Sequence, residues 1–377
     1  MTINEGKKRS VFQLTSRHSI TDNRIFNLMA ETLAEAGYDS AVVGPHDSSS
    51  ISEGVRLIAI PRTQKRLARL VRLMAPWKLL FFSLRSRECN TFAIHDPDML
   101  KIGFLLKVFG NVVLYDIHDD YEASVKSRLL RFGRVFASIG AKIWWIYERS
   151  LTQIFDGVIV ADRHLAKKFS EKRPVILGNF PTLDFTKQAD TSRESTFNLI
   201  YVGEANRDRG ALQFLKALRL LPHSDIRCHI VGNCFDEEVK SLMSQDERVC
   251  FHGRMPWKDL SGFYERSHLG LAIYQPIPAF TYCTGENAVK IQEYMAAGIA
   301  ILTSNFQGLI EYVEVARTGL TVQPDSPTAI AEKIDLLYKD RKLLRELGGN
   351  GRLAFEERYN WDMHKYKLVD LYDEKFQ

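Results

Sequence analysis

The chain has 377 residues, of which 45% are hydrophobic and 26% are charged, and this is typical of a folded protein with two domains. No apolar run is long enough to span a bilayer, no signal peptide precedes the first strand, and the five cysteines lack CxxC spacing, so we expect a cytoplasmic protein with reduced thiols. The net charge of +5 is uneven, because residues 1–180 hold 27 Lys and Arg against 18 Asp and Glu.

Short apolar runs alternate with helical patterns through the first half. Helices are predicted over residues 22–37, capped by Asp22 and ended by Gly37, over 97–110, and as one long helix over about 123–151. Strands are predicted at 11–16, 38–44, 55–61, 91–96, 111–119, 157–162 and 173–181.

The polar segment 182–196 lacks periodicity and is predicted to link two domains. After it the alternation restarts. Strands are predicted at 197–203, 227–232, 248–253, 269–275, 300–305 and 318–324, with helices between them and over 327–338, 340–355 and 360–376. The pattern therefore predicts an α/β protein with two doubly wound domains, residues 1–181 and 182–360, whose ligands bind in the cleft between them.

Two segments of the second half suggest a site for a phosphate and a ribose. In YVGEANRDRGALQFLKAL (201–218) a strand ends at Gly203 and a helix starts near Gly210, so backbone N–H groups with Arg207 and Arg209 suit a phosphate. A solvent-exposed basic loop is the alternative. In GENAVKIQEYMAAG (285–298), Lys290 and Glu293 lie three residues apart on one helical face, where they form either an exposed ion pair or a site for a phosphate and a ribose.

Several segments resemble glycosyltransferase family 4, a family of retaining enzymes with the GT-B fold. The residues that carry the resemblance lie in family order over nearly the whole chain: HDPDML (95–100), VVLYDIHDDYE (112–122), LGNFP (177–181), IYVGEANRDRG (200–210), VCFHGRM (249–255), GLAIYQP (270–276), KIQEYMAAGIAILTSNF (290–306) and RYNWDMHKYK (358–367). The resemblance implies a GT-B fold of two Rossmann-like domains, the first for the acceptor and the second for the nucleotide sugar. Residues 361–377 are expected to pack back toward the first domain.

The resemblance also implies roles for individual residues. Glu293 would hold the ribose, Arg209 the donor phosphates, and His118 the transferred sugar. The predicted catalytic residues are His118, Glu286 and Lys290; the donor-binding residues are Gly203, Arg207, Arg209, Gly232, Gly285, Lys290 and Glu293; the acceptor-binding residues are His18, Asp96, Asp98 and Asp119.

The chain departs from the family pattern at three places. Six residues separate Glu286 from Glu293 where the family has seven, which places Gly285 at the family position. Glu204 stands where the family has an arginine, and Arg207 lies in the same loop. TSRHSITD (15–22) replaces a loop that usually has two glycines.

Residues 62–87 carry eight Lys and Arg and no acid, and residues 126–149 add Lys126, Arg128, Arg131, Arg134 and Lys142 together with Trp144 and Trp145. Such basic, aromatic-bearing segments suit an anionic membrane surface, although a solvated helix face is the alternative. The predicted membrane-surface residues are Lys65, Arg66, Arg69, Arg72 and Trp77. No nucleic-acid motif accompanies the charge, so nucleic acid is not an expected partner.

The resemblance implies a glycosyltransferase that moves a sugar from a UDP- or GDP-linked donor to a saccharide acceptor in cell-surface polysaccharide or glycolipid synthesis. The basic segments favour a lipid-linked acceptor and a position on the inner face of the membrane. The cationic residues and the helix start are expected to stabilise the leaving diphosphate without a metal cofactor. The alternatives are a non-hydrolysing nucleotide-sugar epimerase and a catalytically silent GT-B subunit that binds a partner enzyme. A nicotinamide dehydrogenase is excluded because no GxGxxG follows the first strand.

Overall fold

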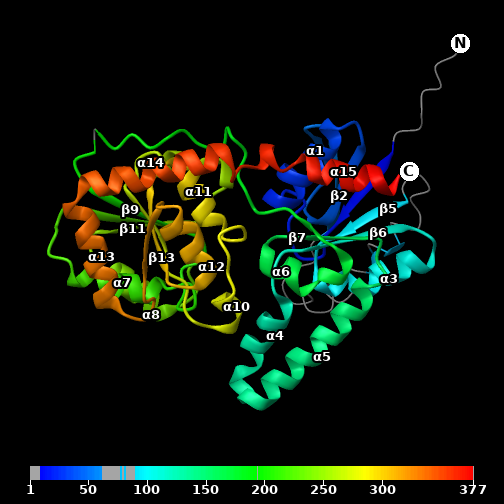
Figure 1. Cartoon of the computed structure of the whole chain (residues 1–377), viewed down its shortest axis with the longest axis horizontal. Coiled ribbons are helices and arrows are strands. Elements are labelled where there is room, and N and C mark those ends of the chain that lie inside the picture. Colours follow the sequence, from blue (N-terminus) through cyan, green and yellow to red (C-terminus); the bar gives the residue numbers. More distant parts are fainter. Residues whose placement is uncertain (1–8, 62–76, 79, 82–89, 193, 377) are drawn as a thin grey trace, which may run out of the picture. The chain divides into compact units, whose positions relative to one another are not determined.

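The computed structural model describes residues 9–61, 77–78, 80–81, 90–192 and 194–376. They form two compact units, which are described separately below (Figure 1). The first unit contains the described residues up to Gly178 together with those from His364 onward, and the second contains Asn179–Met363.

The first unit is built on an eight-stranded sheet in the order β3-β4-β2-β1-β5-β6-β7-β8. Its strands are β1 (Ser10–Leu14), β2 (Asp39–His46), β3 (Ser50–Ser52), β4 (Val55–Pro61), β5 (Thr91–Ile94), β6 (Val112–Ile117), β7 (Gly157–Val160) and β8 (Val175–Ile176). All neighbours pair in parallel except β3 and β4. The edge strand β3 is short, mostly exposed and absent from the sequence-based prediction.

The helices of this unit cover both faces of the sheet, because its strands are apolar on both sides. Val42 and Leu57 pack with the first helical segment, whereas Val43 and Phe92 pack with residues of α3. The helical segments are η1 (Asn23–Ala30), α1 (Glu31–Glu35), η2 (Pro97–Met99), α3 (Leu100–Val108), α4 (Tyr121–Leu129), η3 (Leu130–Phe132), α5 (Arg134–Thr152), α6 (Arg163–Lys168), η4 (Ser170–Lys172) and the C-terminal α15 (Tyr366–Lys375).

The prediction of one helix over 123–151 is wrong. Gly133 adopts φ +108°, which breaks the helix and lets α4 and α5 fold against each other. The two helices project from the unit as an arm, with residues 130–133 at the turn (Figure 1). The sequence pattern predicted one helix because the apolar residues of α4 and α5 keep the same helical spacing across Gly133.

The second unit has a six-stranded parallel sheet in the order β11-β10-β9-β12-β13-β14. Its strands are β9 (Phe197–Val202), β10 (Ile226–Val231), β11 (Val249–Gly253), β12 (Leu269–Ala272), β13 (Ala300–Ser304) and β14 (Gly319–Val322). Order β10-β9-β12 marks the switch point of a doubly wound sheet, where ligands bind beyond the carboxyl ends of the strands.

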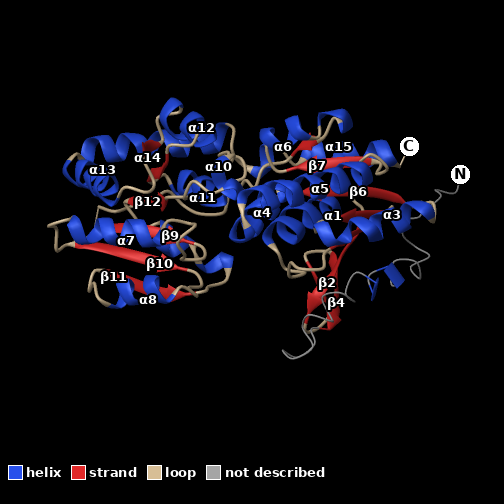
Figure 2. Ribbon diagram, turned by 90° about the horizontal axis from the view of Figure 1, so that it is seen from below, coloured by secondary structure: helices blue, strands red, loops and turns tan. Residues whose placement is uncertain are grey.

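Helices lie on both sides of this sheet (Figure 2). Leu199 and Tyr201 pack on one face, in a core shared with α7, α13 and α14, while Ile200 faces the core shared with α11. The helical segments are α7 (Ala211–Leu220), α8 (Glu237–Ser244), η5 (Trp257–Asp259), α9 (Ser261–Tyr264), α10 (Pro278–Thr281), α11 (Val289–Ala297), α12 (Gln307–Ile310), η6 (Glu311–Val315), α13 (Pro327–Lys339), α14 (Arg341–Glu357) and η7 (Trp361–Met363).

The C-terminal helix α15 belongs to the first unit. Tyr372 is fully buried there and accepts a hydrogen bond from Gln13 Nε2 at 3.1 Å. Asp373 accepts hydrogen bonds from Tyr38 at 2.7 Å and Arg9 at 2.9 Å. The chain therefore returns to its first unit after completing the second.

Candidate active site

Lys290, in the first turn of α11, is a buried cation that makes no hydrogen bond or ion pair within the described part of the chain. Among the described residues its Nζ has no hydrogen-bond partner, and it lies 3.8 Å from the centre of the Tyr201 ring and 5.4 Å from that of Tyr274. Burial, reinforced by the charge of Arg209, holds the pKa of Lys290 well below its usual value. Burying an ammonium without a paired anion costs free energy, so this position favours the binding of an anion.

Two glycine turns meet Lys290 at the carboxyl ends of β9 and β10. Gly203 has φ +116°, and a Cβ there would lie 3.3 Å from Lys290 Cε. Gly232 has φ +147°, and a Cβ there would lie 2.0 Å from the carbonyl oxygen of Gly203. Only glycine therefore fits the two turns, and the structure brings three of the predicted donor residues together.

The loop after β9 carries both predicted arginines, but they have different surroundings. Arg209 lies next to Gly210 at the start of α7, its guanidinium is 5.6 Å from the centre of the Phe280 ring, and no ion pair to it is found among the described residues. Arg207 is exposed and pairs with Glu238 and, at 3.0 Å, with Asp236. Arg209 is thus the better placed of the two to meet an anion beside Lys290.

Glu293 lies one turn after Lys290 and is buried. Its Oε1 accepts a hydrogen bond from Trp257 Nε1 and its Oε2 accepts one from Tyr264 Oη, both at 2.7 Å. Burial raises the pKa of Glu293 to about 6, although these two bonds and Lys290 act against the rise. The two aromatic donors fix the orientation of the carboxylate.

Gly285 and Glu286 lie in the tight loop before α11. A Cβ at Gly285 would lie 2.0 Å from the Tyr312 ring, so this residue is held by packing. Glu286 is buried; its Oε2 accepts a hydrogen bond from Thr284 Oγ1 at 3.3 Å, and its carbonyl accepts one from the Asn179 amide at 3.0 Å. The one-residue departure from the family spacing is therefore accommodated by an ordered loop.

The first unit carries a second polar cluster around His118, at the carboxyl end of β6. His118 Nε2 lies 2.6 Å from Asp116 Oδ2, and Arg24 donates to both oxygens of the same carboxylate at 2.9 and 2.7 Å. Burial alone would raise the pKa of Asp116, but Arg24 and then His118 hold it well below its usual value. His95, also buried, bridges Asp116 at 3.0 Å and Gln13 Oε1 at 2.8 Å.

His95, Asp116 and His118 have ligand atoms within 4.8 Å of one another, a spacing that metal sites also show. Here the carboxylate already pairs with the Arg24 guanidinium through both oxygens. A positive charge in contact with the same carboxylate opposes a divalent cation. The arrangement therefore fits a hydrogen-bonded network that orients His118.

The predicted acceptor residues lie close to this network. Asp96 Oδ2 accepts hydrogen bonds from Thr15 Oγ1 and the Ser16 amide, both at 2.7 Å, so this carboxylate holds the loop after β1 in place. The His18 ring lies 5.5 Å from the His118 ring, centre to centre. Burial acts to lower the pKa of His18, but Asp22 and Asp96 outweigh it and raise the pKa to about 9.

The two remaining acidic residues of the predicted acceptor set differ in exposure. Asp98 accepts a hydrogen bond from Ser16 Oγ at 2.9 Å and pairs with Arg17 at 3.0 Å. Asp119 is exposed, and its charge contributes to the raised pKa of His18. His18, Asp96, Asp98 and His118 therefore gather at one edge of the first sheet.

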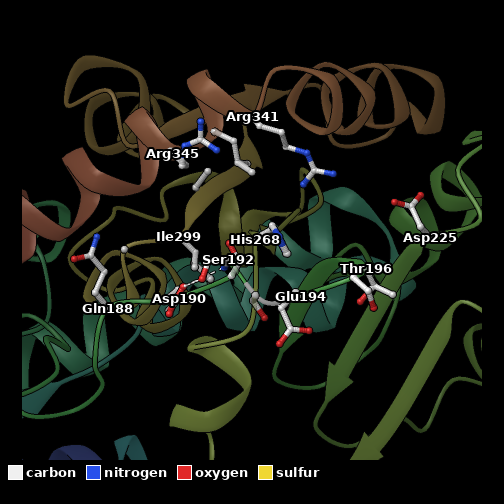
Figure 3. Close-up of a pocket in the computed structure, with 17 residues that line it drawn as sticks. Gln188, Asp190, Ser192, Glu194, Thr196, Asp225, His268, Ile299, Arg341 and Arg345 are labelled. Atoms are coloured by element: carbon white, nitrogen blue, oxygen red, sulfur yellow. Dashed lines mark hydrogen bonds between the residues drawn. The ribbon is translucent and has the colours of Figure 1, made fainter.

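A cavity of about 470 Å³ in the second unit lies elsewhere (Figure 3). It is lined by Thr196, Asp225, His268 and Ile299, each of which precedes a strand of the sheet, and by Arg341 of α14. It therefore lies at the amino ends of the strands, opposite the edge that holds Gly203 and Gly232. None of the predicted site residues lines it.

Of the predicted membrane-surface residues, only Trp77 lies within the described residues. Its side chain is half exposed, and Lys101 Nζ lies 5.5 Å from the centre of its ring. Lys65, Arg66, Arg69 and Arg72 lie outside the described residues. Within the described part of the chain, no helix has the length and apolar character needed to cross a membrane.

Sequence reasoning missed the residues that support the predicted site. They are Arg24, His95 and Asp116 behind His118, Trp257 and Tyr264 behind Glu293, and Tyr201 and Tyr274 around Lys290. Asp116 had a signal, because it lies two residues before His118 and therefore on the same face of the strand end. The aromatic partners come from segments that are distant in the sequence, and no local pattern indicated them.

Comparison with known proteins connects this geometry to a family. Residues 184–354 match the family model described as glycosyl transferases group 1. The capsular polysaccharide biosynthesis glycosyltransferase CapM of Staphylococcus aureus is 24% identical over 184 residues, and the match spans about half of each chain, 47% of this one and 46% of the relative.

Solved structures match over nearly the whole chain. Sucrose-phosphate synthase from Thermosynechococcus elongatus has a TM-score of 0.78 at 18% identity and covers 98% of this chain and 99% of its own. HepE of Anabaena, in complex with UDP-glucose, has a TM-score of 0.73 at 14% identity and covers 97% of this chain and 99% of its own. The chain has the GT-B fold, and its residues 184–354 match the group 1 glycosyl transferases, or glycosyltransferase family 4.

Proposed function

We propose that the protein is a glycosyltransferase that takes a sugar from a UDP- or GDP-linked donor and transfers it to a saccharide hydroxyl with retention of configuration. The observation that carries the proposal is the buried, unpaired ammonium of Lys290 between the Gly203 turn and Arg209. The complex of HepE with UDP-glucose supports a UDP-linked donor. The name of CapM supports an acceptor in capsular or related cell-surface polysaccharide synthesis.

In this proposal the second unit binds the donor. The diphosphate lies against the Gly203 turn and the start of α7, where Lys290 and Arg209 neutralise its charge. Glu293, fixed by Trp257 and Tyr264, accepts the ribose hydroxyls. Because the cations stabilise the negative charge that builds up on the diphosphate as its bond to the sugar breaks, no metal is required.

The first unit binds the acceptor, and its polar edge around His18 and His118 positions hydroxyl groups. Asp116, held by Arg24, fixes His118 toward the transferred sugar. The acceptor oxygen forms the new bond to the anomeric carbon on the face that the diphosphate leaves, and the departing phosphate oxygen takes the acceptor proton. We further propose a lipid-linked acceptor, which places the protein on the inner face of the membrane.

A donor panel tests this function. Thermal unfolding is measured with UDP- and GDP-linked sugars, and each sugar that stabilises the protein is then offered with saccharide acceptors. We expect stabilisation by one nucleotide series and transfer to an acceptor. Epimerised nucleotide sugar without an acceptor would support the epimerase, and the absence of any donor binding would support the silent subunit.

The variant Glu293→Gln is the matched test of the donor assignment. It keeps the size of the side chain and one acceptor oxygen for Trp257 or Tyr264, but it removes the charge that receives the ribose. We expect turnover to fall by about 10²-fold or more while the protein stays folded. Turnover close to that of the unaltered protein would contradict the role of Glu293.

A further inference from the structure

The arm formed by α4 and α5 has an exposed apolar stripe. Large apolar side chains recur along α5 and the turn before it at helical spacing, and each is between 40% and 75% exposed. The stripe consists of Phe132, Val135, Phe136, Ile139, Ile143, Ile146 and Tyr147.

The opposite face of α5 carries small side chains and packs against α4. Ala137 and Ala141 are buried, and a Cβ at Gly140 would lie 2.4 Å from Leu129 of α4. Trp144 and Trp145, the aromatic residues of the basic segment 126–149, pack partly buried against the core of the sheet. The helix thus faces its large apolar side chains outward, the reverse of a helix that serves only the core.

The same arm carries a one-sided charge. Residues 126–147 contain five basic residues and no acid: Lys126, Arg128, Arg131, Arg134 and Lys142. Within the described part of the chain, none of the five has an ion-pair partner, although Arg131 stacks on Phe132 at 4.7 Å. Cations beside an apolar stripe are complementary to a surface that offers both anionic groups and hydrocarbon.

We propose that the α4–α5 arm docks on an anionic lipid bilayer, with the stripe from Phe132 to Tyr147 in the interface and the five cations on lipid headgroups. A second copy of this chain is a poorer occupant, because its arm would bring the same five positive charges to the contact. The basic segment 62–87 is also a poor candidate to bind the stripe, because its eight Lys and Arg, with no acid, would bring further positive charge to the arm. The assignment deepens the proposed function, on which it rests for the lipid-linked acceptor.

The test is co-flotation of the full chain with vesicles of phosphatidylethanolamine and phosphatidylglycerol, compared with vesicles of phosphatidylcholine alone. We expect binding to the anionic vesicles that weakens as salt is raised. Combined Arg131→Gln, Arg134→Gln and Lys142→Gln should weaken it on the order of a hundredfold. Combined Val135→Ser, Ile139→Ser and Ile143→Ser should weaken it about tenfold or more without changing the charge.

The matched control combines Leu220→Ser, Leu336→Ser and Leu353→Ser, which removes exposed apolar side chains from the second unit and should leave flotation unchanged. Circular dichroism verifies that each variant is folded. Arm variants that float like the unaltered protein would overturn the proposal, as would a dimer in solution that the serine variant dissociates while vesicle binding persists. Donor stabilisation measured on the same variants separates the two proposals, because the arm variants should keep it even when flotation is lost.

Discussion

Lys290 is the residue on which the proposed donor site depends, because its ammonium is buried and makes no hydrogen bond among the described residues. Replacing it by methionine, Lys290→Met, removes the cost of burying a polar group, so we expect the free protein to be stabilised by about 1–3 kcal/mol. The same change removes a charge from the diphosphate and should weaken donor binding by about 2–5 kcal/mol. Thermal unfolding and calorimetric titration check the two opposite effects; a variant that is both less stable and unchanged in donor binding would contradict the assignment.

The lowered pKa of Lys290 also predicts a proton linkage. A bound diphosphate favours the charged ammonium and raises its pKa, so between the two pKa values the complex holds one more proton than the free protein. Donor binding should therefore take up a proton and weaken as the pH rises through this range. Calorimetry in buffers with different ionisation enthalpies measures the uptake, which Lys290→Met should abolish; equal heats in all buffers would count against the linkage.

His18 predicts a pH dependence of stability in the first unit. Its pKa in the folded state is about 9, above the ordinary value of 6.5, because Asp22 and Asp96 outweigh its burial. The stabilisation is thus fully present below pH 6.5 and is lost as the pH rises through about 9. Denaturant unfolding should show a decline over this range that is smaller in His18→Gln. The control is His229→Gln, because the pKa of His229 is lowered instead of raised. This variant should keep the decline in stability.

At the scale of the elements, the site depends on the contact between the turns that follow β9 and β10. Gly232→Ala would place a Cβ 2.0 Å from the Gly203 carbonyl oxygen at a φ of +147°. We expect a loss of about 1–3 kcal/mol in the free energy of unfolding and weaker donor binding, because the turns must separate. Gly262→Ala, in α9 with open space around its Cβ, should leave donor binding unchanged and serves as the control. Equal donor binding in both variants would show that the turns do not shape the site.

The elements show how much of the fold could be predicted and why the rest could not. Strands such as 157–160 were predictable because a parallel strand covered on both faces is a continuous apolar run. The break at Gly133 was not, because its φ of +108° depends on the packing of α5 against α4, which the apolar period of the two helices does not record. The short strand β3, Ser50–Ser52, pairs with β4 through backbone groups, and three mostly exposed residues are too few to show a strand pattern.

The candidate site also has residues that could be predicted from the sequence and residues that could not. Gly203, Gly232 and Lys290 were predictable, because glycines after strands and a lysine at a helix start are local features, and the structure brings them together. The donors to Glu293 come from Trp257 and Tyr264, distant in sequence, and only the tertiary fold brings them to it. Arg207 was predicted to meet phosphate, but its pairing with Asp236 depends on the placement of α8.

At the scale of the whole molecule, the last helix completes the first unit. Tyr372→Ala in α15 removes a fully buried ring and should cost the first unit about 3–5 kcal/mol. Scanning calorimetry should show an earlier transition for that unit and an unchanged one for the second. Tyr366→Ala, an exposed position in the same helix, should change neither. A common shift of both transitions in Tyr372→Ala would show that the units unfold as one.

The central claim is that the second unit binds the diphosphate of a nucleotide sugar at Lys290. The measurement that tests it most directly is a crystal structure with the nucleotide sugar that stabilises the protein most. We predict phosphate oxygens within hydrogen-bond distance of Lys290 Nζ, beside the Gly203 turn, with the ribose on Glu293. A nucleotide bound elsewhere, for instance in the cavity lined by His268 and Arg341, with Lys290 still unpaired, would contradict the account.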